Sequence, residues 1–409
     1  MTARRPFIAL VLATVLSITG TRFSAIAIPW LVLTTTGSPV LTGLVGLAEM
    51  LPYVLAKGLG GPLIDRIGAR RVSVWLDHGS AIAVAVVPLL FWAGLLSIWV
   101  LLPAVAVIGV LRAPSDASKQ ALVPAVAAMA GVPLERVAGL VSAGERLAGT
   151  LGAASAGLLI ALLGEGAALL VNALGFLLSG VVLAAGVQHS AVVEETIDKP
   201  VSTYRQDFAD GWHFMRRDAV LVGLVLMIAF TNLFDQAYSL VLLPVWVRTE
   251  GLDVTWVGIL LAVFSGSAIA GSAMAAAWGD RLPRLLLYTV GFLCAGPLAM
   301  GVYAASLPLP VIIVVLLIGG TAAGFINPII SAILFERIPK PMVGRVVALV
   351  GALSWSLIPF GGLYAGLLVD GYGIGTALGI TATLYGVATL TPLVVPSFRE
   401  MNRKRVAPA

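Results

Sequence analysis

The sequence predicts an all-α membrane protein whose twelve transmembrane helices form two pseudo-symmetric halves of six. Three observations predict this fold class: an apolar composition, apolar runs of membrane-spanning length, and an internal repeat. Of the 409 residues, 59% are hydrophobic and only 11% are charged, whereas soluble domains carry about a quarter charged residues. Such a chain needs lipid as its main solvent, and in lipid every backbone polar group needs an internal partner, which favours helices.

Apolar runs of about 20 residues, each long enough to cross a hydrocarbon core of about 30 Å, recur along the chain. Charged residues, Gly and Pro separate these runs. The expected spans begin near Phe7, Pro39, Val72, Ile98, Val137, Gly166, Ala219, Val254, Leu285, Leu309, Gly344 and Gly373. The first run continues to Leu33, which is too long for a signal peptide, so we expect an uncleaved first helix.

The longest polar stretch divides the spans into two sets of six. We expect an N-terminal half at residues 1–187, a cytoplasmic connecting loop at 188–218, a C-terminal half at 219–396 and a basic cytoplasmic tail at 397–409. The end of the connecting loop has the pattern of an amphipathic surface helix. Lys and Arg are concentrated in loops on the side of the termini, while the opposite loops hold only Arg248. The positive-inside rule therefore predicts that both termini are in the cytoplasm, and we expect the protein in the plasma membrane.

The two halves are related by a repeat with an offset of 215 residues. This shift superposes Pro29 on Pro244, Gly43 on Gly258, Asp65-Arg66 on Asp280-Arg281, Gly109 on Gly324 and Pro124 on Pro339. Two six-helix repeats related by an axis along the membrane normal are a transporter architecture, with the substrate site between the repeats at mid-membrane.

A charged turn interrupts the apolar sequence between the second and third spans. Its sequence, GPLIDRIGARR, matches the pattern G-x-L-x-D-R-x-G-x-(R/K)-(R/K). The matching residues are Gly61, Leu63, Asp65, Arg66, Gly68, Arg70 and Arg71, and Asp280 with Arg281 repeats part of the pattern in the second half. A glycine at position 68 permits a tight turn that a residue with a Cβ would strain, and the Arg residues can reach lipid phosphates.

This turn resembles the loop signature of the major facilitator superfamily, and the resemblance covers essentially the whole chain. Residues 25–52 further resemble its drug- and siderophore-exporting branch, which includes macrolide- and tetracycline-type efflux pumps. The resemblance implies that Asp65 latches the outward-facing state and that spans one, four, seven and ten line a central cavity. It also implies that Arg112, in the place of the family's span-four arginine, takes part in proton coupling. Gly139, Gly152 and Gly157 match part of the family's antiporter pattern in span five.

Ionisable residues within spans are costly and indicate function. By expected depth they form an inner layer of Asp77, Arg112, Asp116, Glu145 and Arg146, and an outer layer of Arg22, Glu49 and Asp235. Because Arg112 and Asp116 are four residues apart, we expect them to pair along one helix face. The alternative is an ion network that only stiffens the half.

A proton-coupling carboxylate must change its charge during the transport cycle. Asp235 lies on an expected cavity-lining span and ranks first as the proton carrier, Glu49 ranks second, and Arg112 and Asp116 are further coupling candidates. The remaining candidates for contact with substrate in the cavity are Arg22, Asn232, Gln236, Tyr238 and Asn327.

We therefore expect a monomeric secondary transporter, not an enzyme, that exports small amphipathic compounds such as drugs or siderophore-like molecules by proton antiport and alternating access. A proton-coupled importer or symporter of a metabolite, and a membrane scaffold or sensor without transport, remain alternatives. The expected partners are the small-molecule substrate, protons and the lipid bilayer.

Other function classes lack sequence support. The net charge of +5 is spread over short loops, which does not favour a nucleic-acid partner. The sequence holds no G-x4-G-K-S/T phosphate loop for ATP-driven transport. His78, His189 and His213 lack metal-ligand spacing, and Cys294 is the single cysteine, so we expect no metal and no cofactor.

Overall fold

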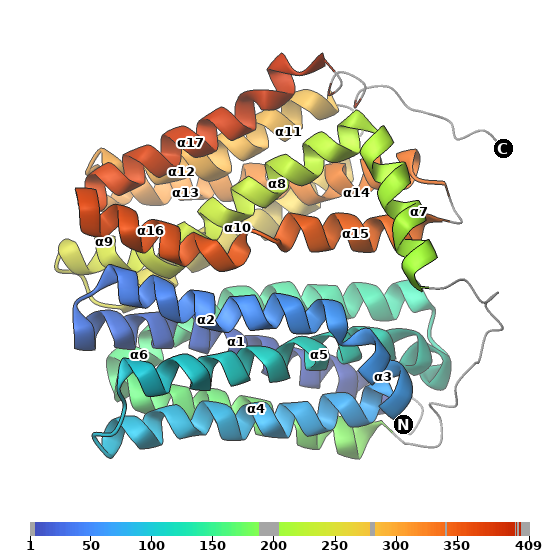
Figure 1. Cartoon of the computed structure of the whole chain (residues 1–409), viewed down its shortest axis with the longest axis horizontal. Coiled ribbons are helices and arrows are strands. Elements are labelled where there is room, and N and C mark those ends of the chain that lie inside the picture. The colour runs from blue at the N-terminus through green and yellow to red at the C-terminus, as the bar shows by residue number, and fades with distance from the viewer. Residues whose placement is uncertain are drawn as a thin grey trace. The chain divides into compact units, whose positions relative to one another are not determined.

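The computed structural model describes residues 5–187, 204–278, 283–339, 342–396, 398 and 401. The regular elements within these ranges are helices (Figure 1). Eleven of these helices are long and apolar enough to cross a membrane. The prediction of an all-α, multi-pass membrane protein is thus confirmed, while the count of twelve spans stays a prediction.

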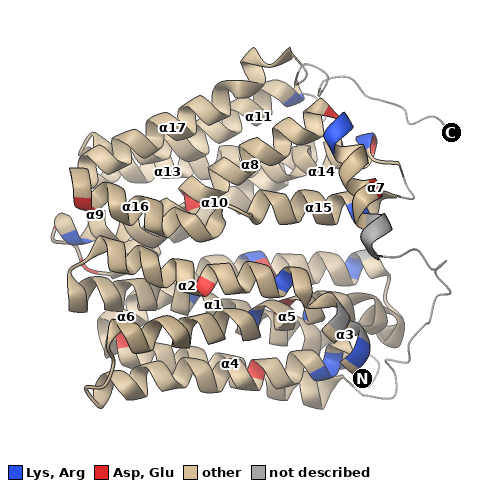
Figure 2. Ribbon diagram, in the orientation of Figure 1, with Lys and Arg blue, Asp and Glu red and all other residues tan. Residues whose placement is uncertain are grey.

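The described residues fall into two compact units. The first unit lies within Met1–Glu195 and Leu243–Ala262, and the second within Thr196–Leu242 and Val263–Ala409. In both units most charged residues lie near helix ends, and a few lie midway along helices (Figure 2). These few lie where lipid or protein replaces water, so they define the places to search for function.

The first unit is built around α6 (Leu134–Gly186), two consecutive helices that meet at Gly164. Its elements are α1 (Arg5–Thr36), α2 (Pro39–Leu59), α3 (Gly61–Ile67), α4 (Ala69–Trp92), α5 (Ile98–Ala130), α6 (Leu134–Gly186), α9 (Leu243–Thr249) and the first part of α10 (Thr255–Trp278). α1 and α4 pack against α6, and α5 packs against α2 and α4. Ser38 starts α2, because its side chain accepts a hydrogen bond from the Leu41 backbone N–H and a proline follows at the first helical position.

The long helix α6 is broken at Gly164. A straight helix of 53 residues would extend about 80 Å, far beyond a hydrocarbon core of about 30 Å. Gly164 has φ 79° and ψ 165°, a non-helical conformation that L side chains rarely adopt. The break lies close to the predicted boundary between the fifth and sixth spans.

The second unit begins with a short helix that leads into the spans. Its elements are α7 (Tyr204–Arg217), α8 (Ala219–Ala237), the π-helical turn η3 (Tyr238–Leu242), the rest of α10, α11 (Arg284–Leu293), the π-helical turn η5 (Cys294–Leu298), α12 (Ala299–Ala304), α13 (Leu309–Ala323), α14 (Ile326–Arg337), α15 (Val343–Trp355), α16 (Ile358–Tyr372) and α17 (Ile374–Val394). α8 packs against α15, α16 and α17.

One carboxylate connects three of these helices. Asp218 lies between α7 and α8 and accepts hydrogen bonds from the Val220 and Leu221 backbone N–H groups at 2.9 and 3.3 Å, which caps α8. Arg337, at the end of α14, donates to the same carboxylate from Nε and Nη2 at 2.8 and 3.0 Å. The charge of Asp218 is thereby matched by a bidentate guanidinium.

The predicted repeat is visible in the packing of two glycines. A Cβ on Gly109 of α5 would overlap the backbone carbonyl oxygen of Glu49 in α2. At the corresponding Gly324, a Cβ would lie 2.5 Å from the Ala268 carbonyl oxygen of α10. In each unit, therefore, a glycine on the fourth predicted span lets the second predicted span of that half approach backbone to backbone.

Candidate functional site

The central feature of the first unit is an ion pair between α2 and α5. Nη1 of Arg112 donates to Oε1 of Glu49 at 2.7 Å, and the two side chains are only 5% and 7% exposed. The predicted pair of Arg112 with Asp116 is therefore wrong. The Arg112 side chain is buried, and its part in proton coupling stays a prediction.

The physical reason lies in the approach of the two helices at Gly109, one turn before Arg112. Since Gly109 has no Cβ, the backbone of α2 at Glu49 contacts α5 directly. Glu49 thus lies level with Arg112 rather than in a separate outer layer, which corrects the predicted two-layer sorting. Helix spacing alone identifies neighbours on one helix, but it does not fix the relative depth of two helices.

Tyr53 connects the ion pair to Asp116. Its ring centroid lies 4.7 Å from Cζ of Arg112, within the range of a cation–π interaction. Its hydroxyl donates to Oδ2 of Asp116 at 3.2 Å, so Tyr53 contacts both the guanidinium and the carboxylate that was its predicted partner. Glu49, Tyr53, Arg112 and Asp116 together form what we call the α2–α5 ion cluster.

Two further charged residues extend this cluster. Nζ of Lys57 lies 5.8 Å from the Tyr53 ring centroid, and Asp116 and Glu145 both act on Lys57 electrostatically. Arg22, on α1, is exposed, lies against Gly149 and Gly152 of α6, and is repelled by Arg112. Charges of both signs therefore lie at mid-span in the first unit, at Glu49 and Arg112, and Lys57 adds a positive charge in the last turn of α2.

A second buried pair was missed by the sequence analysis. Nζ of Lys119 donates to Oδ1 of Asp77 at 2.8 Å, and these side chains are 3% and 0% exposed. Ser115 donates to the same oxygen at 2.5 Å, and Ser179 donates to Oδ2 at 2.6 Å. The network joins α4, α5 and α6. The signal available in the sequence was Lys119 itself, which follows Ser115 by one helical turn on α5.

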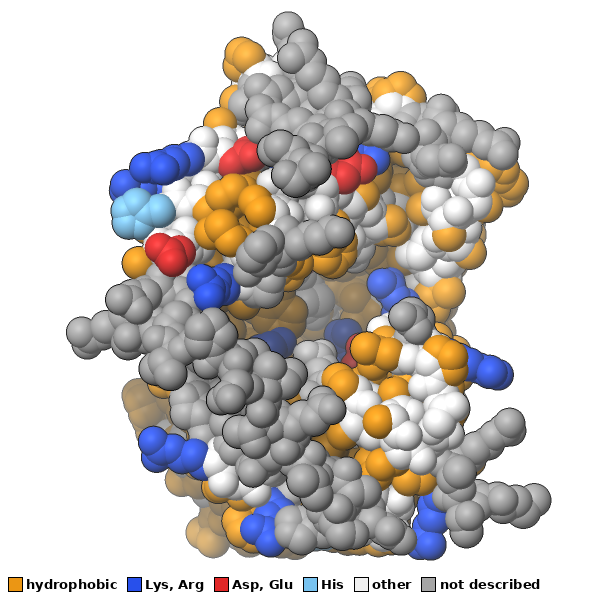
Figure 3. Space-filling model, turned by 90° about the vertical axis from the view of Figure 1, so that its right-hand side faces the viewer, with side chains coloured by type: hydrophobic (Ala, Val, Ile, Leu, Met, Phe, Trp, Pro, Cys, Tyr) orange, Lys and Arg blue, Asp and Glu red, His pale blue; other side chains and the backbone are white. Residues whose placement is uncertain are grey.

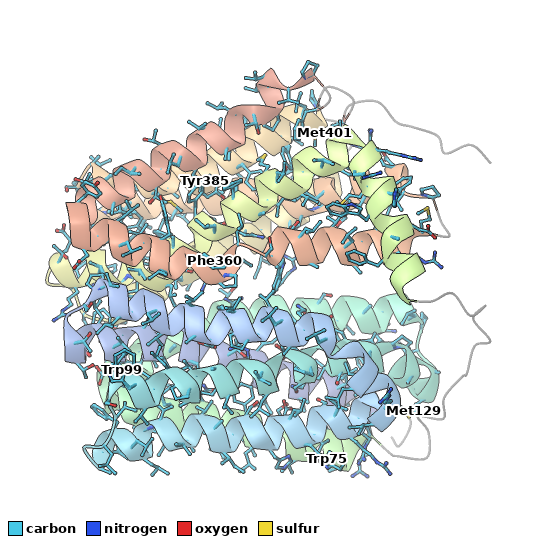
Figure 4. The ribbon with its side chains drawn as sticks, in the orientation of Figure 1. Trp75, Trp99, Met129, Phe360, Tyr385 and Met401 are labelled. Carbon is cyan, nitrogen blue, oxygen red and sulfur yellow. The ribbon has the colours of Figure 1, made fainter. Side chains whose placement is uncertain are left out.

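In the second unit, Asp235 lies near the end of α8 beside an aromatic group. The Asp235 side chain is exposed, and Tyr385 donates to its Oδ2 at 3.4 Å from α17, where Figure 4 labels this tyrosine. Phe234 packs on Tyr385 and Tyr364 with centroid distances of 5.7 and 5.8 Å. Because the membrane span continues beyond α8, from Ala219 to Thr249, Asp235 is an accessible carboxylate near mid-span beside a neutral hydrogen-bond donor.

The other cavity candidates differ in their surroundings. Nδ2 of Asn232 donates to the Ser354 carbonyl oxygen at 2.9 Å, and the Tyr238 hydroxyl donates to that of Tyr303 at 2.8 Å. Both side chains are thus engaged within the second unit.

Gln236 is half-buried, with its Cβ close to Gly361. Asn327, on α14, is exposed. The role of all four candidates in substrate contact stays a prediction.

The charged turn contains the short helix α3 and a left-handed glycine. Gly61 begins α3, Gly68 has φ 91°, and Leu63, Arg66 and Arg71 are exposed. The side chain of Asp65 lies outside what the structure describes, as do Asp280 and Arg281 in full.

Arg70 has a role that the sequence did not predict. Its Nη2 donates to the Ala184 carbonyl oxygen at 2.6 Å, and its Nε donates to that of Val187. Arg5 donates to the Ala185 carbonyl oxygen at 3.0 Å. Two guanidinium groups therefore satisfy the free carbonyls at the C-terminus of α6, where the helix dipole favours positive charge.

Comparison with known proteins agrees with this architecture. The family model of the Major Facilitator Superfamily matches residues 10–363 and 225–408. Multidrug efflux pump Tap of Mycobacterium tuberculosis (strain ATCC 25618 / H37Rv) is 31% identical over 408 residues, which cover 98% of this chain and 95% of that protein. The protein of the same name from Mycolicibacterium fortuitum is 29% identical, covering 98% of each chain.

Solved structures share the fold at lower identity. A variant of the nucleoside transporter NupG has a TM-score of 0.76 at 14% identity, covering 97% of this chain and 99% of that one. A D-xylose-proton symporter has a TM-score of 0.69 at 16% identity, covering 97% of each chain. At these identities the likeness shows the fold alone.

Proposed function

Because the chain belongs to the major facilitator superfamily, we propose that this transporter exports small amphipathic compounds, drugs among them, in exchange for protons. The name of its relative, multidrug efflux pump, supports both the direction and the substrate class. In this proposal, two six-helix halves, residues 1–187 and 219–396, open the substrate site alternately to the two sides of the membrane. The transporter works as a monomer in the plasma membrane, with both termini in the cytoplasm.

The observation that carries the proton coupling is the setting of Asp235. A coupling carboxylate must gain and lose a proton without leaving a neighbouring buried charge unpaired. Asp235 is exposed at mid-span and hydrogen-bonded to a neutral phenol, Tyr385. A phenol can donate to the ionised carboxylate and can also accept from the protonated one, so the hydrogen bond survives both states.

Glu49 is less suited to that role because of its partner. Protonation of Glu49 would leave the Arg112 guanidinium buried beside a neutral acid, and an uncompensated buried charge is strongly unfavourable. We therefore assign the α2–α5 ion cluster to holding the first unit in register, and Asp235 to the proton.

The test uses inverted membrane vesicles and a fluorescent lipophilic cation, ethidium, as the probe. Acidifying the lumen should drive ethidium into vesicles that carry the unmodified protein. Asp235→Asn should abolish this accumulation while ethidium binding to the purified protein is retained. Asp370→Asn, at an exposed carboxylate near the end of α16, is the matched control and should transport normally.

Two outcomes would contradict the proposal. If Asp235→Asn still concentrates ethidium and Glu49→Gln does not, the proton carrier is Glu49. If cells expressing the protein accumulate the compounds of a drug panel rather than losing them, the chain is an importer.

A further inference from the structure

The junction of α7 and α8 carries two adjoining cavities of opposite character. A pocket of about 810 Å³ is lined by polar and charged residues that include Asp210, Arg217, Asp218, Arg337 and Arg345. A groove of about 870 Å³ is lined almost entirely by apolar residues of α8, α16 and α17. Ala219, the first residue of α8, lines both. The two cavities therefore meet where the apolar span begins.

Positive charge predominates at this meeting point. The carboxylate of Asp218 is matched by Arg337, and that of Asp210 lies 3.8 Å from Arg345. Arg216 and Arg217 then add two more guanidinium groups, and both side chains are exposed. Arg216 lines the groove and Arg217 lines the pocket. Figure 3 shows basic and acidic side chains gathered around a histidine on the face seen there.

The groove has the length of a lipid chain in one leaflet. Along α8 it is lined from Ala219 to Phe234, which corresponds to about 22 Å of helix. Half of a hydrocarbon core of about 30 Å is about 15 Å, so the groove can take the acyl chain of one leaflet over its whole depth. Its wall is shaped by Gly223, which leaves room for the ring of Phe398.

We propose that this composite site binds an anionic phospholipid from the adjacent leaflet. The headgroup phosphate lies at Arg216 and Arg217, and one acyl chain lies along the groove between α8 and α17. Guanidinium groups recognise phosphate through charge-assisted hydrogen bonds, and the apolar lining offers a chain no competing polar partner. A lipid can place its headgroup at the charged pocket and its acyl chain in the apolar groove at the same time, whereas a small cation in the groove would be repelled by Arg216.

The headgroup is tested by native mass spectrometry of the purified, delipidated protein. Dioleoyl phosphatidylglycerol is titrated against dioleoyl phosphatidylcholine, which has the same chains and no net charge. The unmodified protein should prefer phosphatidylglycerol, and the double variant Arg216→Gln/Arg217→Gln should lose about 30-fold in affinity for it, at about fivefold for each basic residue near a membrane surface. Arg136→Gln, an exposed Arg at the start of α6, is the matched control and should bind as before.

The chain is tested by filling the groove. Ala388→Phe places a ring among the lining residues of α17 and should weaken binding of phosphatidylglycerol, while Val394→Phe, exposed on the same helix outside the lining, should not. Equal affinity for the two lipids, or an unchanged preference in the double Arg variant, would overturn the headgroup assignment. Tetraphenylphosphonium that binds the groove, with loss in Ala388→Phe and no displacement by phosphatidylglycerol, would show that a lipophilic cation is the occupant.

Discussion

The ion pair of Glu49 and Arg112 makes a quantitative prediction for a double-mutant cycle. Nη1 and Oε1 lie 2.7 Å apart with both side chains nearly buried. Removing one partner of a buried pair leaves the other charge uncompensated, which costs about 3–5 kcal/mol in soluble proteins. The measured free energies of polar interactions between membrane helices are smaller, because polar groups also find hydrogen-bond partners in the unfolded state in lipid. We therefore expect Glu49→Gln and Arg112→Gln each to cost about 3 kcal/mol, the low end of that range.

The double variant Glu49→Gln/Arg112→Gln leaves no buried charge unmatched at this point. It should cost clearly less than the sum of the single changes, with a coupling free energy of about 2 kcal/mol. For a unit of about 200 residues, a cost of about 3 kcal/mol lowers the melting temperature by roughly 6–12 °C. The assay is thermal unfolding of the detergent-solubilised protein, followed by the fraction that remains monodisperse after heating.

A second cycle serves as the control. Arg112→Gln combined with Asp116→Asn should show a coupling less than half as large, because the direct ion pair of Arg112 is with Glu49 and Tyr53 is the residue that contacts both Arg112 and Asp116. A larger coupling of Arg112 to Asp116 than to Glu49 would refute the assigned pairing and restore the neighbour expected from helix spacing. Purely additive losses in the Glu49 cycle would refute the pair itself.

Three further predictions concern other contacts. Gly109→Ala should strongly reduce the amount of folded protein in the membrane, because the added Cβ would overlap the α2 backbone. The control is Gly351→Ala, at a helical glycine with open space around it, which should be neutral or stabilising by up to about 1 kcal/mol. Equal expression of both variants would contradict the close approach of α2 and α5. Lys119→Met should lower the melting temperature by roughly 6–12 °C, and adding Asp77→Leu should recover at least half of that loss; no recovery would argue that Lys119 acts independently of Asp77. Asp65→Asn should reduce ethidium transport at least tenfold while expression stays normal, and wild-type transport in that variant would exclude the latch.

The fold class could be predicted from the sequence because composition and run length decide it. A chain with 11% charged residues leaves helices as the means of satisfying its backbone in lipid, and this prediction is confirmed. The repeat was predictable for a similar reason, since Gly109 and Gly324 mark positions where two backbones touch. Both properties can be found in the sequence without knowing how the helices pack.

The partners within the charged site were not predictable in the same way. Spacing on one helix pointed from Arg112 to Asp116, whereas the true partner stands on another helix 63 residues earlier. Which carboxylate pairs with Arg112 depends on the depth at which α2 and α5 contact each other. That depth follows from the close packing of the two helices at Gly109. Lys119 was not predicted as a buried charge because α5 runs for 33 residues. A residue near the end of the expected span therefore lies in the interior of the unit.

The network of Asp77 has a consequence for how the protein is made. Asp77 reaches the membrane with α4, but its countercharge Lys119 follows 42 residues later. At a synthesis rate of about 5–20 residues per second, the carboxylate waits about 2–8 s for that partner. A lone Asp at the centre of a span costs about 2.5–3.5 kcal/mol at the translocon, and Asp77, in the third turn of the 24-residue helix α4, lies nearer the helix start, where the cost is smaller. The buried ion pair of Asp77 and Lys119 can therefore form only after α5 has followed α4 into the membrane.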